Sequence, residues 1–285
     1  MNKLMSLRSL TLGAAAALLL AGAPAAFAQE HGAPQPHRES WSFAGPFGKY
    51  DQAQLQRGFQ VFKEVCSSCH SAHLFAFRNL AQEGGPGYSE DQAKTVAEEY
   101  KVQDGPNDSG DMFERPARLS DRWPSPFPNE QAARASNGGA FPPDFSVLAK
   151  ARTYEVGFPG FLIDVLKQYQ EQGPDYIHAL LNGYKDTPPE GFNLPEGAHY
   201  NEYFPGHAIK MPKPLSDDQV TYSDGTPQTV DQYSRDVVAF MMWLAEPHLE
   251  ARKRIGFQVM LFLILFAGLL YFTKKKVWKS VHDHA

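Results

Sequence analysis

Two segments of the chain repeat apolar residues with the period of an α-helix. In the first, residues 51–70, Asp51 is placed to cap the helix N-terminus. Spacings of four and three put side chains on one helix face, so we predict a helix whose apolar face carries both cysteines into the core. Its apolar positions are Leu55, Phe59, Phe62, Cys66 and Cys69.

The second periodic segment covers residues 229–244, near the end of the polar part of the chain. Thr229 and Gln232 fit the capping box that starts many helices, and Pro247 ends the helix before the final apolar run. We predict that this helix and the first one pack together in the core. Its apolar positions are Tyr233, Val237, Phe240 and Leu244.

The region between these helices is rich in loops. Pro and Gly crowd stretches such as "DGPNDSGD", "RWPSPFPNE" and "DTPPEGFNLPEG", and both residue types interrupt regular structure. Short helices are expected near residues 90–100, 144–153, 161–171 and 174–182. The sequence therefore predicts a mainly α fold with long loops.

The C-terminal part of the chain has the composition of a membrane anchor. Residues 255–273 contain no charged side chain, and at ~1.5 Å per residue a helix of this length nearly crosses the ~30 Å hydrocarbon core. Basic residues precede and follow the run, which suits side chains that reach the headgroups. We predict one transmembrane helix with basic flanks over 251–279 and a short cytoplasmic tail over 280–285.

The N-terminal 28 residues have the pattern of a signal peptide. Lys3 and Arg8 precede a short Ala- and Leu-rich run, and "AFA" at 26–28 matches the cleavage pattern. We therefore predict that residues 1–28 are removed and that residues 29–250 form a periplasmic domain. A domain of this size can bury a substantial core.

The exported part of the chain is acidic. Residues 29–254 contain 21 basic and 31 acidic side chains, a formal charge of −10. Such a domain does not suit nucleic acid, and it favours a basic protein partner. Two acidic runs, 90–99 and 104–114, are the candidate docking residues.

The only two cysteines, Cys66 and Cys69, lie in "CSSCH" with His70 directly after them. A zinc site would need further ligands, usually a second cysteine or histidine pair, and a thioredoxin-like redox pair would need a βαβ surround. Covalent haem c uses all three residues: two thiols bond the haem and the histidine binds its iron. The motif therefore predicts one haem c attached through Cys66 and Cys69, with His70 as the proximal ligand.

The residues alone leave more than one candidate for the second ligand of the iron. Met211 lies in "IKMPKPL", where flanking prolines stiffen the loop. His207, four residues earlier, is the rival. Met112 lies in a polar stretch, and Met241 and Met242 are expected to fill the core. Met211 is the favoured candidate.

These segments together resemble the cytochrome c1 family, whose members are haem c subunits of the cytochrome bc1 complex. The resemblance covers about residues 40–280 and rests on "RGFQVFKEVCSSCH", "NGGAFPPDFSVLAKAR", "PDYIHALLNGY", "YFPGHAIKMPKPL" and the final anchor. It implies a class I-like cytochrome c domain with one C-terminal transmembrane helix.

The resemblance also implies roles for individual residues. It makes Met211 the second iron ligand beside His70, and it places Arg152 near a haem propionate, where a guanidinium suits a carboxylate. Pro143 and Tyr176 would line the haem. Some relatives hold an extra disulfide in a loop, and this chain has no cysteines for one.

The function implied by the resemblance is one-electron transfer without substrate chemistry of its own. The donor would be the Rieske iron–sulfur protein, with cytochrome b as the other partner subunit in a dimeric complex of the bacterial inner membrane. The acceptor would be a soluble basic c-type cytochrome. The alternatives are a free-standing anchored monohaem cytochrome, a subunit of another respiratory complex, a haem peroxidase and a thiol–disulfide oxidoreductase.

Overall fold

The computed structural model describes residues 33–154 and 156–282. The predicted signal peptide, the predicted domain start at residue 29 and the last three residues lie outside the described ranges. All described residues belong to one unit, which runs from Ala33 to Ala285.

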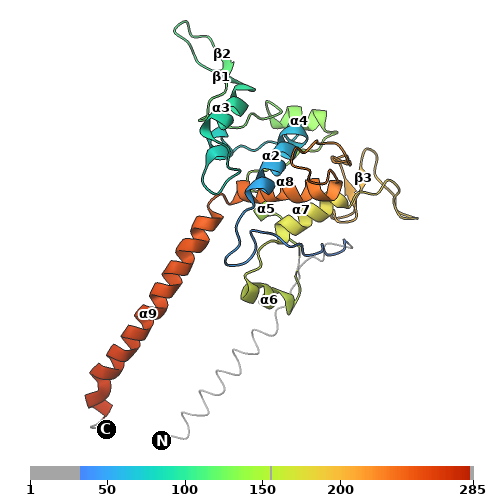
Figure 1. The fold of residues 1–285 in the computed structure, drawn as a ribbon. Coiled ribbons are helices and arrows are strands. Elements are labelled where there is room, and N and C mark those ends of the chain that lie inside the picture. Colours follow the sequence, from blue (N-terminus) through green and yellow to red (C-terminus); the bar gives the residue numbers. More distant parts are fainter. Residues whose placement is uncertain (1–32, 155, 283–285) are drawn as a thin grey trace, which may run out of the picture. The chain divides into compact units, whose positions relative to one another are not determined.

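Two helices cross at the centre of the core. Helix α2 (Gln52–Glu64) and helix α8 (Val230–Ala245) pack against each other, as the apolar periodicity predicts (Figure 1). The crossing is close because α2 has a glycine there: a Cβ on Gly58 would lie 2.0 Å from the carbonyl oxygen of Asp236. The core is predominantly aromatic around this crossing, with Phe59, Phe62, Phe75, Trp123, Phe240 and Trp243 in mutual ring contact.

Helix α2 is shorter than the sequence predicts. Asp51 caps it as expected, because its carboxylate accepts a hydrogen bond from the backbone N–H of Gln54 at 2.9 Å. The helix ends at Glu64, and the short 3₁₀ helix η1 (Cys66–Ser68) follows. The prediction that Cys66 and Cys69 belong to the helical face is therefore wrong. The backbone changes from α-helix to 3₁₀ helix at this point, and the cysteine motif forms a separate turn.

At the N-terminus of α8, only one of the two hydrogen bonds of the predicted capping box is formed. The Thr229 hydroxyl accepts from the N–H of Gln232 at 3.3 Å. The Gln232 side chain does not return to the cap; it donates to Asp236 at 2.9 Å. Asp236 is fully buried and also bonds Arg57 on α2 and Tyr222, so a side-chain hydrogen bond to the residue one turn further along α8 takes the place of the bond to the cap.

The remaining helices are short. They are η2 (Phe77–Ala81), α3 (Glu90–Glu98), α4 (Glu130–Ser136), α5 (Leu148–Ala151), α6 (Gly160–Lys167) and α7 (Gln172–Asn182). Helices α5 and α7 pack against α8. Helix α4 was not predicted. The helix expected over 144–153 is reduced to one turn, because residues 143–146 instead hydrogen-bond to the motif and to the loop after it.

Two small antiparallel pairs of strands complete the described fold. Strands β1 (Lys101–Asp104) and β2 (Phe113–Pro116) form a hairpin that projects from α3, and β3 (His199–Tyr200) pairs with β4 (Ala208–Ile209) (Figure 1). In the first pair Lys101 faces Pro116 and Asp104 faces Phe113. Neither pair was predicted, because such short segments carry no clear alternation of polar and apolar residues.

The final helix, α9, runs from Leu249 to His282 and extends away from the haem-motif domain as a single rod (Figure 1). Its apolar side chains are exposed, and residues 249–279 are long and apolar enough to cross a membrane. The break at Pro247 separates it from α8, as predicted. The fold is thus a mainly helical domain with one long apolar C-terminal helix.

Candidate cofactor site

The cysteine motif forms a tight turn after α2. The backbone N–H groups of Cys69 and His70 both donate to the carbonyl oxygen of Cys66, at 3.1 and 2.9 Å. Both cysteines are free thiols. The turn therefore gathers two thiols and one imidazole in five consecutive residues without a disulfide between them.

The imidazole of His70 is held by a residue far along the chain. Its Nδ1 lies 2.8 Å from the carbonyl oxygen of Pro143. A carbonyl can only accept, so Nδ1 carries the proton and Nε2 keeps its lone pair. The ring also lies 4.4 Å from the ring of Phe145, centroid to centroid. Burial lowers the pKa of His70, so the neutral form, which binds metals, is favoured.

Asp144 fixes the two segments that meet at His70. One carboxylate oxygen accepts from the Ser71 hydroxyl and from the N–H of His73, both at 2.8 Å. The other accepts from the N–H of Ser146 at 2.8 Å. These hydrogen bonds join the loop after the motif to the "PPDFS" segment, so the position of Pro143 relative to His70 is determined by three acceptor contacts of one side chain.

Cys66 is not prepared as a reactive thiolate. Burial, with a contribution from Cys69, raises its pKa to about 12. Redox-active cysteines instead have lowered pKa values, because the thiolate is the nucleophile. The environment of Cys66 therefore disfavours a thiol–disulfide oxidoreductase.

Met211 follows strand β4 and is half-buried. Its carbonyl oxygen accepts from the hydroxyl of Tyr184 at 3.1 Å. Burial, with a smaller contribution from Tyr176, raises the pKa of Tyr184, so the phenol stays protonated and keeps donating. The structure thus fastens the Met211 loop to the chain just after α7. His207, the rival ligand, has φ 59° and its Nδ1 lies 3.2 Å from the carbonyl oxygen of Asn201.

The three other residues predicted to contact the haem, Pro143, Tyr176 and Arg152, differ from one another in their surroundings. Pro143 is half-buried and bonded to His70, and Tyr176 on α7 packs against the core. Arg152 is exposed, and its guanidinium makes no hydrogen bond or ion pair with the described residues. The structure therefore joins Pro143 to the motif directly, whereas it leaves Arg152 unconnected to His70 or Met211.

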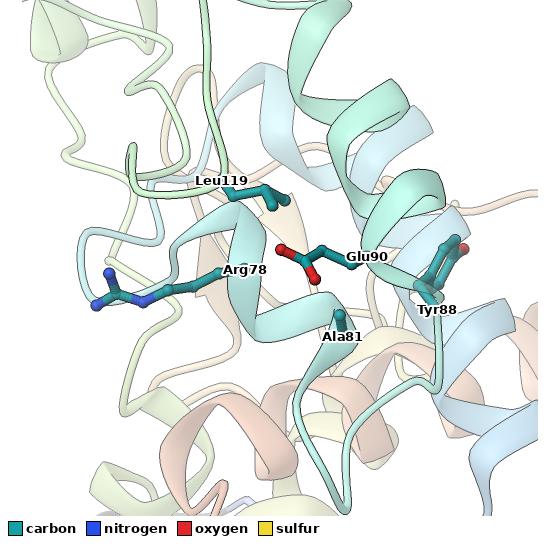
Figure 2. A pocket seen from close by; sticks show the side chains of 5 residues that line it. All are labelled: Arg78, Ala81, Tyr88, Glu90 and Leu119. Atoms are coloured by element: carbon teal, nitrogen blue, oxygen red, sulfur yellow. The ribbon is translucent and has the colours of Figure 1, made fainter.

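Two surface pockets of the described domain bear on the position of a site. The larger, about 300 Å³, lies between η2 and α3 and includes Arg78 and Glu90 (Figure 2). It contains none of the predicted site residues. The smaller, about 160 Å³, is lined by Cys69 and Ser71 of the motif loop, by Pro142 and by the 125–130 loop. The pocket beside the motif is the one relevant to the chemistry.

The residues at the motif fit a haem c. Two free thiols are available for its two covalent bonds, and a neutral imidazole presents an unprotonated Nε2. The other ring nitrogen, Nδ1, already donates a hydrogen bond to the carbonyl oxygen of Pro143. A ligating histidine is usually oriented by such a bond.

Comparison with known proteins agrees with this fit. The profile of the cytochrome C1 family matches residues 41–281, which is most of the chain. The chain belongs to the cytochrome c1 family. Membership of this family implies haem c as the cofactor. It also accounts for the turn of the cysteine motif, for the "PPDF" segment (142–145) that hydrogen-bonds to His70 and to the loop after it, and for the long C-terminal helix.

Curated relatives of the family are similar over nearly the whole chain. "Cytochrome c1" of Blastochloris viridis is 54% identical over 89% of this chain and 90% of its own length. "Cytochrome c1" of Rhodospirillum rubrum is 47% identical over 94% and 96%. "Cytochrome b/c1" of Bradyrhizobium diazoefficiens is 63% identical over 96% of this chain, which spans only 40% of that protein.

Sequence reasoning missed Asp144 and Tyr184, which position the predicted ligands. Asp144 stands in the quoted "FPPDF" segment, and an aspartate in a loop is a residue type that often bonds nearby backbone groups. Tyr184 carries no comparable signal, since a tyrosine after a helix more often reflects core packing.

Proposed function

We propose that this chain is the haem c subunit of a cytochrome bc1 complex and passes single electrons through the complex to a soluble c-type cytochrome. The observation that carries the proposal is family membership over residues 41–281 combined with a motif whose histidine is already oriented for a metal. It performs no substrate chemistry of its own.

The chain's residues hold and tune the cofactor. When bound, the haem supplies the redox chemistry, taking up and releasing one electron at its iron. Cys66 and Cys69 would attach it covalently, and His70 would bind the iron through Nε2. The Pro143 carbonyl keeps the His70 proton on Nδ1. Met211 is proposed as the second axial ligand, since His/Met ligation gives a higher potential than His/His.

Two further residues are proposed to face the cofactor. Arg152 is exposed and free of ion pairs with described residues, so its guanidinium can meet a propionate without first breaking another contact. Tyr176 lies on α7 beside Tyr184, which supports a place near the Met211 loop. Both remain proposals.

The proposed partners follow from the family and the charge. The Rieske iron–sulfur protein would donate the electron, and cytochrome b would be the membrane partner in a dimeric complex. A basic soluble cytochrome would accept, because the −10 exported domain attracts positive charge. We place the chain in the bacterial inner membrane as a single-pass protein, with the haem domain in the periplasm.

The test is purification from the native membrane in mild detergent, followed by a reduced-minus-oxidised spectrum and subunit identification. Co-elution of c-type and b-type haem signals with an iron–sulfur protein supports the proposal. A single c-type haem eluting alone would show a free-standing anchored cytochrome instead. Absence of covalent haem after acid–acetone extraction would exclude both.

A further inference from the structure

Helix α6 exposes its apolar side chains and buries a charged one. Asp164 is only 5% exposed, whereas Leu166 is 84% exposed and the preceding Phe158 is 81% exposed. The apolar positions recur at the spacing of one helix face. We call this surface the α6 face; it consists of Phe158, Phe161, Leu162, Val165 and Leu166.

A polar network fixes this inverted orientation. The Asp164 carboxylate forms an ion pair with Arg38 at 2.7 Å and accepts from the Gln172 side chain at 3.1 Å. Gln168 ends the helix in the left-handed conformation with φ 54°. Arg38 also lies over the ring of Tyr169, 4.8 Å from its centroid. Turning the apolar face inward would strip Asp164 of these partners, and an unpaired buried charge is costly.

The α6 face lies at the membrane end of the domain. Tyr169, next to α6, donates to Asp175 at 2.5 Å, and Trp41 donates to the same carboxylate at 2.9 Å. Trp41 stacks on Phe43, whose carbonyl oxygen accepts from Lys253 in the first turns of α9 at 2.6 Å. Figure 1 shows α6 below α5 and α7, on the side toward which α9 extends.

We propose that α6 is an interfacial helix that inserts its apolar face into the headgroup–acyl boundary of the lipid bilayer. Short amphipathic helices bind there through apolar burial and through basic residues at the headgroups. Lys167, exposed at the end of α6, supplies a basic side chain beside this face. At ~1.5 Å per residue the helix is far too short to span, so it lies on the surface. It adds a second lipid contact to the anchor and restricts the tilt of the domain about Pro247.

The proposal rests on α9 crossing the membrane and is independent of the haem. The test uses the full haem-loaded chain in nanodiscs of phosphatidylcholine and phosphatidylglycerol. In that protein Cys66 and Cys69 are thioethers, so one added cysteine takes a fluorophore selectively. Labels are placed by Leu166→Cys and Phe158→Cys, with Leu263→Cys in α9 as the lipid control and Asp108→Cys in the hairpin as the water control.

The readout is quenching by phospholipids brominated on their acyl chains. We expect emission from the labels at 158 and 166 to be quenched and blue-shifted, as at 263 and unlike at 108. If only the label at 263 is quenched, the proposal is overturned. If the label at 263 is not quenched, α9 does not cross the membrane, and the proposal fails with that premise. The same labels are then read in the intact complex. Loss of quenching there would overturn it in favour of a protein contact on the α6 face.

Discussion

One backbone carbonyl orients His70 for its proposed role as an iron ligand. The imidazole donates to Pro143, 73 residues away, and this single bond selects the tautomer that leaves Nε2 for iron. Asp144 then holds Pro143 in place through three bonds to the two segments. The ligand is therefore oriented by main-chain geometry, which a point substitution at position 143 changes only indirectly.

Met211→Leu is predicted to lower the haem midpoint potential while the covalent haem is retained. The thioether would be replaced by a side chain of similar volume that cannot bind iron, and the two cysteines would be unaffected. We expect a fall on the order of 0.1–0.3 V, within the ~0.8 V over which axial ligands set haem potentials. The measurement is a spectroelectrochemical titration.

Met112→Leu is the matched control for this experiment. Met112 is 61% exposed on the β1–β2 hairpin, so its replacement should leave the potential unchanged. An unaltered potential in Met211→Leu would remove Met211 as the ligand and return His207 to consideration.

Helices α2 and α8 approach closely because a glycine lies at their crossing. A Cβ on Gly58 would meet the Asp236 carbonyl oxygen at 2.0 Å and the Phe240 Cβ at 2.8 Å. Arg57, the residue before it, pairs with buried Asp236 at 2.9 Å across the same crossing. Shape and charge thus specify one register between the two helices. Helix α2 leads into the cysteine motif and α8 leads toward α9, so this register fixes the end of α8 relative to the motif.

Gly58→Ala is predicted to lower the free energy of unfolding by about 3 kcal/mol, at the upper end for overpacked cores. Both atoms that the new methyl would meet belong to the helix α8 backbone or its first side-chain carbon, so neither can turn away. Denaturant unfolding of the haem-loaded protein, followed by near-UV circular dichroism, provides the measurement.

Gly157→Ala serves as the control substitution, because nothing lies within 4 Å of its Cβ position. It should change the stability by no more than about 0.5 kcal/mol. Equal stabilities of the two variants would mean that the crossing can widen without cost.

The whole molecule separates its charges along its length. Basic residues flank the apolar part of α9, whereas residues 29–254 carry a formal charge of −10. Some of the acidic side chains proposed for docking are already paired: Asp104 bonds Arg115, and Glu99 lies 2.5 Å from Lys63. Asp108 and Asp111 at the tip of the β1–β2 hairpin are exposed, and they are better candidates for long-range attraction.

Electron delivery to a basic soluble cytochrome is predicted to slow as salt rises. The attraction is screened as the Debye length falls from about 30 Å at 0.01 M to about 3 Å at 1 M. Stopped-flow measurement of the second-order rate constant across this range checks the prediction. Oxidation of the same haem by an uncharged small molecule should stay constant, and a salt-independent protein reaction would contradict acidic docking.

Periodicity and composition determined the main elements of this protein. The α2 and α8 faces, the Asp51 and Thr229 caps, the final apolar helix and the "CSSCH" motif could all be read from local sequence, because each depends on residues within one or two helical turns. The ligand candidates His70 and Met211 were also visible as residue types in suitable loops. Their roles rest on the family.

Only the tertiary structure decided how these parts meet. The Pro143 contact of His70 and the Tyr184 contact of Met211 join residues that are distant in the chain. The direction of α6 is the clearest case. Its periodicity alone favours an apolar face turned to the core, but in the structure Asp164 is buried against Arg38 and the apolar face lies outward. Arg38 lies 126 residues before Asp164, so this pairing cannot be read from the helix itself.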